Sequence, residues 1–325
     1  MPKSKTSLNE LLFDLRRITD HRTVLTEKKI RKIYKSLVKD LNNFLAQYYV
    51  KYADDKGNLT ITKLQEKMKY AKFLEEIENN VNFFAPKIKR EIEGLIDKTY
   101  KACYEGMYRS VKEAKNTKEL IEASGISVRP EVVEQAVNNN ISKLTLSDLL
   151  EKNRKEIVYD IKQTLTTGMI LGDRYDTMAK KILEKVDFSY GKAIRVARTE
   201  SHRNVEAGFM DSANEINKGL EDSNLIYIKI YRNVGDERVR PQQMYKTKKG
   251  WKTKMSRNGA NHMNVNGQVR KITEPFEYSD GEKAMYPGSI ELPARHACNC
   301  RCFCEYDLIT KEEYEKIKKN GGKIL

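Results

Sequence analysis

The spacing of apolar residues changes once along this chain, close to Gly219. Before that point, apolar residues recur every three or four positions, which is typical of amphipathic helices. After it, residues 225–231 are rich in β-branched and aromatic side chains, which favours a strand. Helical patterns that precede strand patterns, rather than alternate with them, indicate an α+β protein. We therefore expect a mainly α-helical N-terminal region followed by a C-terminal domain of helices packed on a small, mostly antiparallel sheet.

Short polar or glycine-containing breaks divide the helical part into segments. One predicted helix starts at Pro86, where the missing N–H costs little. A linker-like Ser-Gly-Ile-Ser stretch at 124–127 places the domain boundary near residue 140, between an α-helical region (1–140) and a C-terminal domain (141–325). The predicted helices cover residues 8–19, 26–53, 61–84, 85–114, 146–167, 175–185 and 190–218, and the predicted strands cover 225–231, 267–269 and 298–306.

The bulk composition limits the class of protein. With 325 residues, of which 39% are hydrophobic and 33% charged, the chain is typical of soluble, helix-rich proteins of two or three domains. No apolar run approaches the roughly 18 to 20 residues that span a bilayer. The N-terminus also lacks the apolar core of a secretory signal. We therefore expect a protein that is made in a cytoplasm and has no membrane partner.

The positive charge of the chain is concentrated in one segment. Residues 238–273 hold ten Lys or Arg and no Asp or Glu, which is +10 of the chain's +15. Aromatic rings among such cations can stack on bases while the cations contact phosphates. The segment is either a nucleic-acid-binding surface or a long solvated loop or hairpin. The residues predicted to bind nucleic acid are Lys246, Lys248, Lys249, Trp251, Lys252, Lys254 and Arg257.

The sharpest local pattern is His296-Ala-Cys298-Asn-Cys300-Arg-Cys302-Phe-Cys304. On an extended strand its thiols would lie along one side, about 6 to 7 Å apart. That spacing is too wide for all four to hold one tetrahedral zinc ion without a bend, whereas two thiols with His296 or His262 could do so. The alternatives are a core strand lined by cysteine, a metal site and redox chemistry. The possible metal ligands are His296, Cys298, Cys300 and Cys302; no cofactor is required, and zinc is the possible one.

The sequence offers no clear catalytic set. Glu200, His202 and Arg203 lie together in a strong helical pattern, but acid–base catalysis requires a second group that converges on them. Asp236 lacks a second acidic cluster nearby, so a two-metal nuclease centre is poorly supported. Walker, GxGxxG, GxSxG and HExxH motifs are absent. We therefore expect a protein that is not an enzyme.

The order of several short patterns carries more information than each pattern alone. Ala-Arg-Thr-Glu at 197–200 is followed by Asp-x-Arg at 236–238, by His-x-x-x-x-Gly at 262–267 and by Asn-Cys-Arg-Cys at 299–302. This order resembles the tailed-phage head-morphogenesis family, the minor head proteins similar to the product of phage Mu gene F, over about residues 150–306. The resemblance implies that the motif is a structural module. Its residues here are Arg198, Thr199, Glu200, Asp236, Arg238, His262, Gly267, Asn299, Cys300, Arg301 and Cys302.

The resemblance implies a minor capsid component of the virion, made in the cytoplasm of a bacterial host. Its expected partners are the portal protein, a scaffold or major capsid protein, and double-stranded DNA. We expect residues 1–140 to dock on portal or scaffold. The alternative function is a zinc-dependent nucleic-acid-binding protein or a toxin or nucleic-acid-processing protein.

The chain departs from the family pattern in three places. Many members carry Cys-x-x-Cys just after Asp-x-Arg, where this chain has Arg240 and Gln243. Members commonly have tryptophan near the end of the first strand, where this chain has Tyr231. The spacing from Asp236 to His262 is also longer than usual. Because this insertion is the lysine-rich part, its role in DNA binding follows from charge alone.

Overall fold

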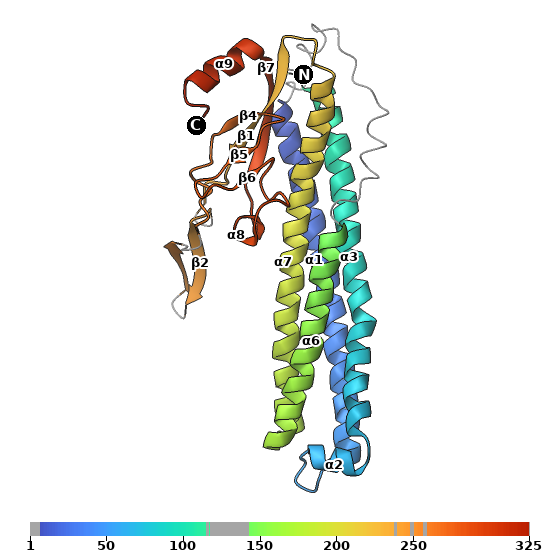
Figure 1. The fold of residues 1–325 in the computed structure, drawn as a ribbon. Helices are drawn as coiled ribbons and strands as arrows, with labels where there is room; N and C mark the ends of the chain where they lie inside the picture. The colour runs from blue at the N-terminus through green and yellow to red at the C-terminus, as the bar shows by residue number, and fades with distance from the viewer. Residues whose placement is uncertain are drawn as a thin grey trace. The chain divides into compact units, whose positions relative to one another are not determined.

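Long helices make up most of the chain up to residue 218, and strands follow them (Figure 1). The computed structural model describes residues 7–114, 117, 143–236, 239–247, 250–255 and 259–324, with backbone alone for 143–148, 242–247 and 250–255. The chain forms two compact units. Unit 1 comprises Met1–Arg22, Ile96–Asn139 and Arg198–Leu325, and unit 2 comprises Thr23–Leu95 and Asn140–Ala197. Each unit therefore draws segments from both sides of residue 140, and the domain boundary set there from the sequence stays a prediction.

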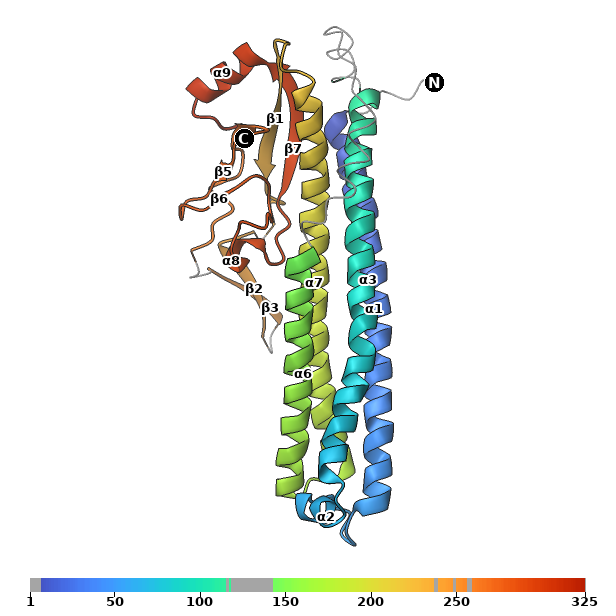
Figure 2. The same cartoon turned by 45° about the vertical axis from the view of Figure 1, so that its right-hand side comes forward.

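Unit 2 is a helical bundle. It contains α2 (Ile61–Glu66), α6 (Lys143–Leu171) and parts of α1 (Leu8–Tyr52), α3 (Tyr70–Glu113) and α7 (Tyr175–Lys218). Figures 1 and 2 show the α1, α3, α6 and α7 segments side by side. The apolar residues that recur every three or four positions along α1 form a stripe that is buried. Its buried members in unit 2 include Ile30, Tyr34, Leu37, Leu41, Phe44 and Leu45.

Two helices are longer than the sequence predicts, whereas the predicted helix 61–84 is divided between α2 and the start of α3. Segments expected as 8–19 and 26–53 form the single helix α1, and those expected as 175–185 and 190–218 form the single helix α7. The intervening residues, 20–25 and 186–189, are partly polar but contain no Gly or Pro. Without either of those residues, a helix continues wherever its buried side packs against neighbours.

The predicted helix start at Pro86 is also wrong. Helix α3 runs from Tyr70 to Glu113 with Pro86 inside it. Pro86 is exposed, whereas Phe84 and Ile88 on either side of it are buried. Proline removes one intrahelical hydrogen bond, but the packing of Phe84 and Ile88 keeps the helix continuous.

Unit 1 is built on a small antiparallel sheet with strand order β4-β1-β7. Strand β1 (Leu225–Arg232) lies in the centre and pairs with β4 (Val269–Lys271) and β7 (Phe303–Thr310). Helix α9 (Lys311–Lys319) follows β7 directly and starts with a capping box at Thr310 and Glu313. Two hairpins, β2 (Gln242–Thr247) with β3 (Gly250–Met255) and β5 (Phe276–Glu277) with β6 (Lys283–Ala284), complete the described strands. The predicted α+β fold is therefore confirmed.

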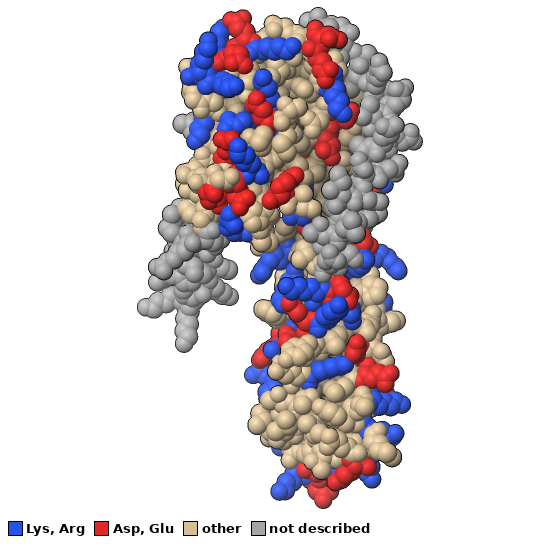
Figure 3. Space-filling model, in the orientation of Figure 1, with Lys and Arg blue, Asp and Glu red and all other residues tan. Residues whose placement is uncertain are grey.

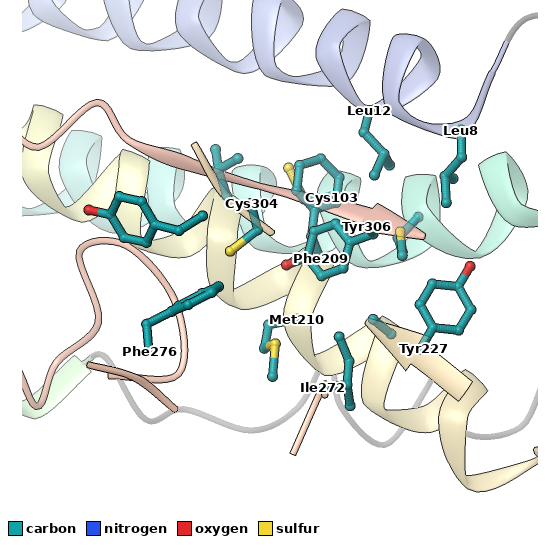
Figure 4. Packing of buried hydrophobic residues seen from close by; sticks show 14 of the residues in the cluster. Leu8, Leu12, Cys103, Phe209, Met210, Tyr227, Ile272, Phe276, Cys304 and Tyr306 are labelled. Atoms are coloured by element: carbon teal, nitrogen blue, oxygen red, sulfur yellow. The ribbon is translucent and has the colours of Figure 1, made fainter. Parts of the chain in front are cut away.

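Both faces of β1 are buried. Ile226, Ile228 and Ile230 share one face, as the alternation predicts, and pack with Tyr314 of α9. Tyr227 and Tyr231 lie on the other face, in the main core of unit 1. Figure 4 shows this core, to which α1, α3, α7, β1, β5 and β7 contribute. Its labelled residues are Leu8, Leu12, Cys103, Phe209, Met210, Tyr227, Ile272, Phe276, Cys304 and Tyr306.

The predicted strand over residues 298–306 begins later than expected. A short helix, α8 (Ala294–Ala297), precedes a turn, and β7 starts only at Phe303. The turn forms because Asn299 adopts a left-handed conformation with φ of 52°, which asparagine tolerates better than most residues. Cys298, Cys300 and Cys302 are therefore not aligned along a strand, and the bend that a metal site would require is present.

Candidate functional site

Residues 298–302, here called the cysteine turn, connect the separate parts of the sequence motif. The Asn299 amide donates a hydrogen bond to Oγ1 of Thr199 on α7, at 3.1 Å. The Arg301 guanidinium forms an ion pair with Asp236, in the segment after β1, at 2.5 Å. Motif residues that lie far apart in the sequence therefore meet at this turn.

Two cysteines of this turn meet a histidine from another loop. Nδ1 of His262 lies 3.3 Å from Sγ of Cys302 and 3.6 Å from Sγ of Cys300. All three residues are at least 96% buried. The His262 amide also donates to the carbonyl of Arg240 at 3.0 Å, which holds this loop in place. The cluster is the group of potential metal ligands that the described residues bring together.

A chain of hydrogen bonds extends behind His262. Nε2 of His262 lies 3.1 Å from Nδ1 of His296, and Nε2 of His296 lies 2.8 Å from Oδ2 of Asp280. Arg295 contacts the same carboxylate at 3.2 Å. Burial lowers the pKa of His296, although its hydrogen bond to Asp280 opposes that shift. The imidazole of His296 therefore connects a partly exposed carboxylate to the buried cluster.

Helix α7 contributes the other side of the site. His202 interacts with Cys300, and its Nε2 atom is buried with no hydrogen-bond partner among the described residues. Glu200 forms an ion pair with Arg203 at 2.5 Å, and Arg203 donates to the carbonyl of Gly288 at 2.9 Å. Desolvation raises the pKa of the Glu200 carboxyl, against the effect of Arg203.

The two cysteine thiols behave as a pair. A hydrogen bond from Cys302, supported by contacts with His202 and His262, holds the pKa of Cys300 well below its usual value. The pKa of Cys302 is raised by its hydrogen bond to Cys300, by burial and by the negative charge of Cys300. Cys304 differs from both. It lies on β7, outside the cluster, and burial raises the pKa of its thiol.

The motif glycine has a backbone role. Gly267 has φ of 80°, a conformation that glycine adopts without strain. Its amide donates to the carbonyl of Tyr231 at 2.8 Å, and its carbonyl accepts from the Ile324 amide at 2.8 Å. A Cβ at this position would lie 2.6 Å from the carbonyl oxygen of Ile324. Glycine is therefore needed because the C-terminal segment crosses here.

The structure places two of the four predicted metal ligands in the cluster. Cys300 and Cys302 lie in the cluster, whereas His296 lies one hydrogen bond behind it. Cys298 is not part of the cluster, and its carbonyl accepts a hydrogen bond from Arg240. Asp280 was not singled out in the sequence, because a single acidic residue in a turn carries no recognisable pattern. Among the other motif residues, Arg198 is exposed, and Arg238 lies outside the described residues.

The predicted nucleic-acid-binding segment includes a hairpin. Strands β2 and β3 pair with each other, with Tyr245 opposite Lys252 and Lys246 opposite Trp251. Lys254 stands opposite Gln243, while Lys248, Lys249 and Arg257 lie outside the described residues. Figure 3 shows Lys and Arg interspersed with Asp and Glu on the described surface of the face in view. That part of the surface carries no large patch of one sign.

The described part of the chain contains no helix that is both long and apolar enough to cross a bilayer.

Comparisons with known proteins give one matching family model and two relatives. Residues 159–305 match the family model described as Phage Mu protein F like protein. The chain is 26% identical over 296 residues to minor head protein GP7 of Bacillus phage SPP1, an alignment that covers 90% of this chain and 85% of that protein. It is also 23% identical over 278 residues to the NAD(+)–arginine ADP-ribosyltransferase EFV of Enterococcus faecalis. That alignment covers 85% of this chain but only 50% of that relative. No solved structure matches the chain.

Proposed function

Because residues 159–305 match the phage Mu protein F-like family and most of the chain is similar to a minor head protein, we propose that it is a minor capsid protein that associates with the portal vertex during head assembly. One observation carries the proposal: similarity to a minor head protein extends over 90% of the chain and so includes most of the N-terminal helices. Contacts among the motif residues support it: Thr199 with Asn299, Asp236 with Arg301, and His262 with Cys300 and Cys302. We propose that the motif is a structural module.

We propose that the protein acts in the head without an enzymatic activity of its own. Glu200, the motif carboxylate, is only 2% exposed and is paired with Arg203, so it does not face a substrate site. The relative named as an ADP-ribosyltransferase is matched over half of its length, and the other half has no counterpart in the alignment. An assay with NAD⁺ and an arginine substrate should show no transfer above background. Transfer that saturates with NAD⁺ would contradict the proposal.

The portal association is tested by co-purification. The full chain carries a tag and is recovered from phage-infected cells, with the tag alone as the control, and the recovered proteins are identified by mass spectrometry. We expect portal and scaffold or major capsid proteins, also after nuclease treatment. Recovery of host proteins or nucleic acid alone would contradict the head-assembly role.

The lysine-rich segment is proposed to contact double-stranded DNA in the head or during its exit. The proposal is supported by the +10 charge of residues 238–273, which contrasts with +5 for the rest of the chain (15 − 10). The test replaces Lys248, Lys249, Lys252 and Lys254 by Gln. Each lost phosphate contact should reduce the slope of log K against log salt by about 0.9, so four should reduce it by about 3.6.

The matched control replaces four exposed lysines of α1 by Gln: Lys28, Lys32, Lys35 and Lys39. This variant loses the same net charge but carries the substitutions in unit 2. We expect it to keep the slope of the unmodified chain. Equal loss of slope in both variants would show that net charge, and not the segment, determines binding.

A further inference from the structure

Three donor atoms from two distant segments converge in unit 1. Nδ1 of His262 and the Sγ atoms of Cys300 and Cys302 all lie within 4.8 Å of one another. The histidine and the two cysteines are 38 and 40 residues apart in the chain. We propose that these three side chains bind one zinc ion, which clamps the cysteine turn to the loop that carries His262.

The spacing of the donors fits the ion. Zinc binds sulfur at about 2.3 Å and imidazole nitrogen at about 2.0 to 2.1 Å in tetrahedral geometry, which places N and S donors about 3.6 Å apart. The two separations in the cluster are 3.3 Å, to Cys302, and 3.6 Å, to Cys300. Two thiolates with an imidazole in a tetrahedral arrangement form a donor set that selects zinc over harder cations such as Mg²⁺ or Ca²⁺. A straight strand would have placed neighbouring thiols about 6 to 7 Å apart, farther than any separation between donor atoms within this cluster.

The hydrogen bonds behind His262 suit a metal ligand. The Asp280 carboxylate can only accept, so Nε2 of His296 donates to it. With Nδ1 of His296 as acceptor, Nε2–H of His262 donates to it and the lone pair on Nδ1 of His262 points toward the two cysteines. One set of protons therefore satisfies every contact in the chain when a metal is bound. Carboxylate-linked histidines of this kind orient metal ligands and strengthen their binding.

A structural zinc ion takes four ligands, and the cluster supplies three of them. His202 of α7 interacts with Cys300 and borders the site, but the group of donor atoms does not include it. Its Nε2 atom, which has no hydrogen-bond partner among the described residues, lies near Gly288. The proposed ion therefore connects the loop of His262 to the cysteine turn, beside α7.

Metal content and thermal stability provide the first test. The full chain is purified without added metal, and zinc is measured by mass spectrometry of the digested protein. We expect about one zinc per chain, as in closed structural sites. Removal with a strong chelator should lower the melting temperature, and added zinc should restore it. A folded chain with no zinc, whose melting temperature changes neither with chelator nor with added zinc, would overturn the proposal.

Single substitutions separate the ligands from the other cysteines. Cys302→Ser and His262→Gln should lose the zinc, whereas Cys304→Ala and Cys103→Ala should keep it, because both of those thiols are buried outside the cluster. Retention of zinc by both ligand variants would refute the assignment. If a ligand variant fails to fold, Co²⁺ replaces zinc in the unmodified chain as a second readout. Thiolate-to-cobalt charge-transfer absorption with intense tetrahedral bands is expected, and a spectrum without the charge-transfer band would exclude cysteine ligands.

The positioning role of the histidine–carboxylate chain has its own signature. Asp280→Asn should weaken zinc affinity about 10- to 100-fold while the stoichiometry at saturating zinc stays the same. Asp222→Asn, at an exposed position near the end of α7, is the matched control and should have no effect. Equal affinities of the Asp280→Asn variant and the unmodified chain would show that the chain of hydrogen bonds does not support the metal site.

Discussion

The buried positive charge of Lys229 in β1 should lower the free energy of unfolding at neutral pH. It lies on the same face of the strand as Tyr227 and Tyr231 and is completely buried. Its ammonium group donates to the carbonyls of Met285, at 2.7 Å, and Ile272, at 3.2 Å. The same ammonium group lies 5.1 Å from the centre of the Phe276 ring. Burial lowers the pKa of Lys229 from 10.5 to about 8.

The size of the effect follows from this pKa. A lowering of about 2.5 units corresponds to about 3 kcal/mol of unfavourable free energy for burying the charge. Below pH 8 the lysine is protonated in both states, so the full cost is present. Between pH 8 and 10.5 the unfolded chain binds more protons than the folded one, and the unfolding free energy therefore rises with pH. Above pH 10.5 both states are neutral and the cost disappears.

The variant Lys229→Met removes the charge and keeps most of the side-chain volume. It leaves two carbonyls without their donor, which costs about 1 to 3 kcal/mol. The variant should therefore be equal to the unmodified chain or up to about 2 kcal/mol more stable at pH 7, and less stable at pH 10. The difference between the two unfolding free energies should change by about 2 to 3 kcal/mol over this range.

Urea denaturation followed by circular dichroism at pH 7, 8, 9 and 10 measures this difference. Other groups that titrate in the range affect both proteins alike and cancel in the comparison. Lys318→Met, an exposed position on α9, is the control and should show no pH-dependent difference. A difference for Lys229→Met that stays constant from pH 7 to pH 10 would refute the reasoning.

Three further substitutions test how unit 1 is held together, each by urea denaturation. Arg16→Met should destabilise the fold by about 3 to 5 kcal/mol, because it leaves the completely buried Glu206 without its ion-pair partner; a loss below about 1 kcal/mol would mean that the pair is solvated. Gly208→Ala should destabilise by about 1 to 3 kcal/mol, since its Cβ would lie 2.8 Å from the carbonyl oxygen of Tyr100; Gly191→Ala, with open space around it, is the control and should not. Thr199→Val should cost about 1 to 3 kcal/mol because an amide of the cysteine turn loses its acceptor, and an unchanged stability would argue against that contact.

The local elements of this fold could be predicted because they depend on neighbouring residues. The alternation of Ile226, Ile228 and Ile230 identified β1 and one of its two buried faces, and the three- and four-residue spacing identified the helices. Helix boundaries were less predictable. Pro86 and the partly polar residues 20–25 indicated breaks, but packing of the buried side outweighed those local preferences.

The candidate site could be predicted in part. Cys300, Cys302, His296 and His262 were all named as possible ligands, but a straight strand would have kept the cysteines apart. The φ of 52° at Asn299 forms the turn that brings two of them to one histidine. Nothing in the sequence around Asp280 indicated that it contacts His296.

The sequence by itself determined the class of fold, the concentration of charge in residues 238–273 and the order of the motif, because periodicity, charge and order are properties of the linear chain. Only the tertiary structure decided which motif residues touch. Thr199 meets Asn299 across 100 positions, and Asp236 meets Arg301 across 65. Such contacts depend on how α7, β1 and the cysteine turn pack around one core, and packing is set by the shapes of side chains that are distant in the sequence.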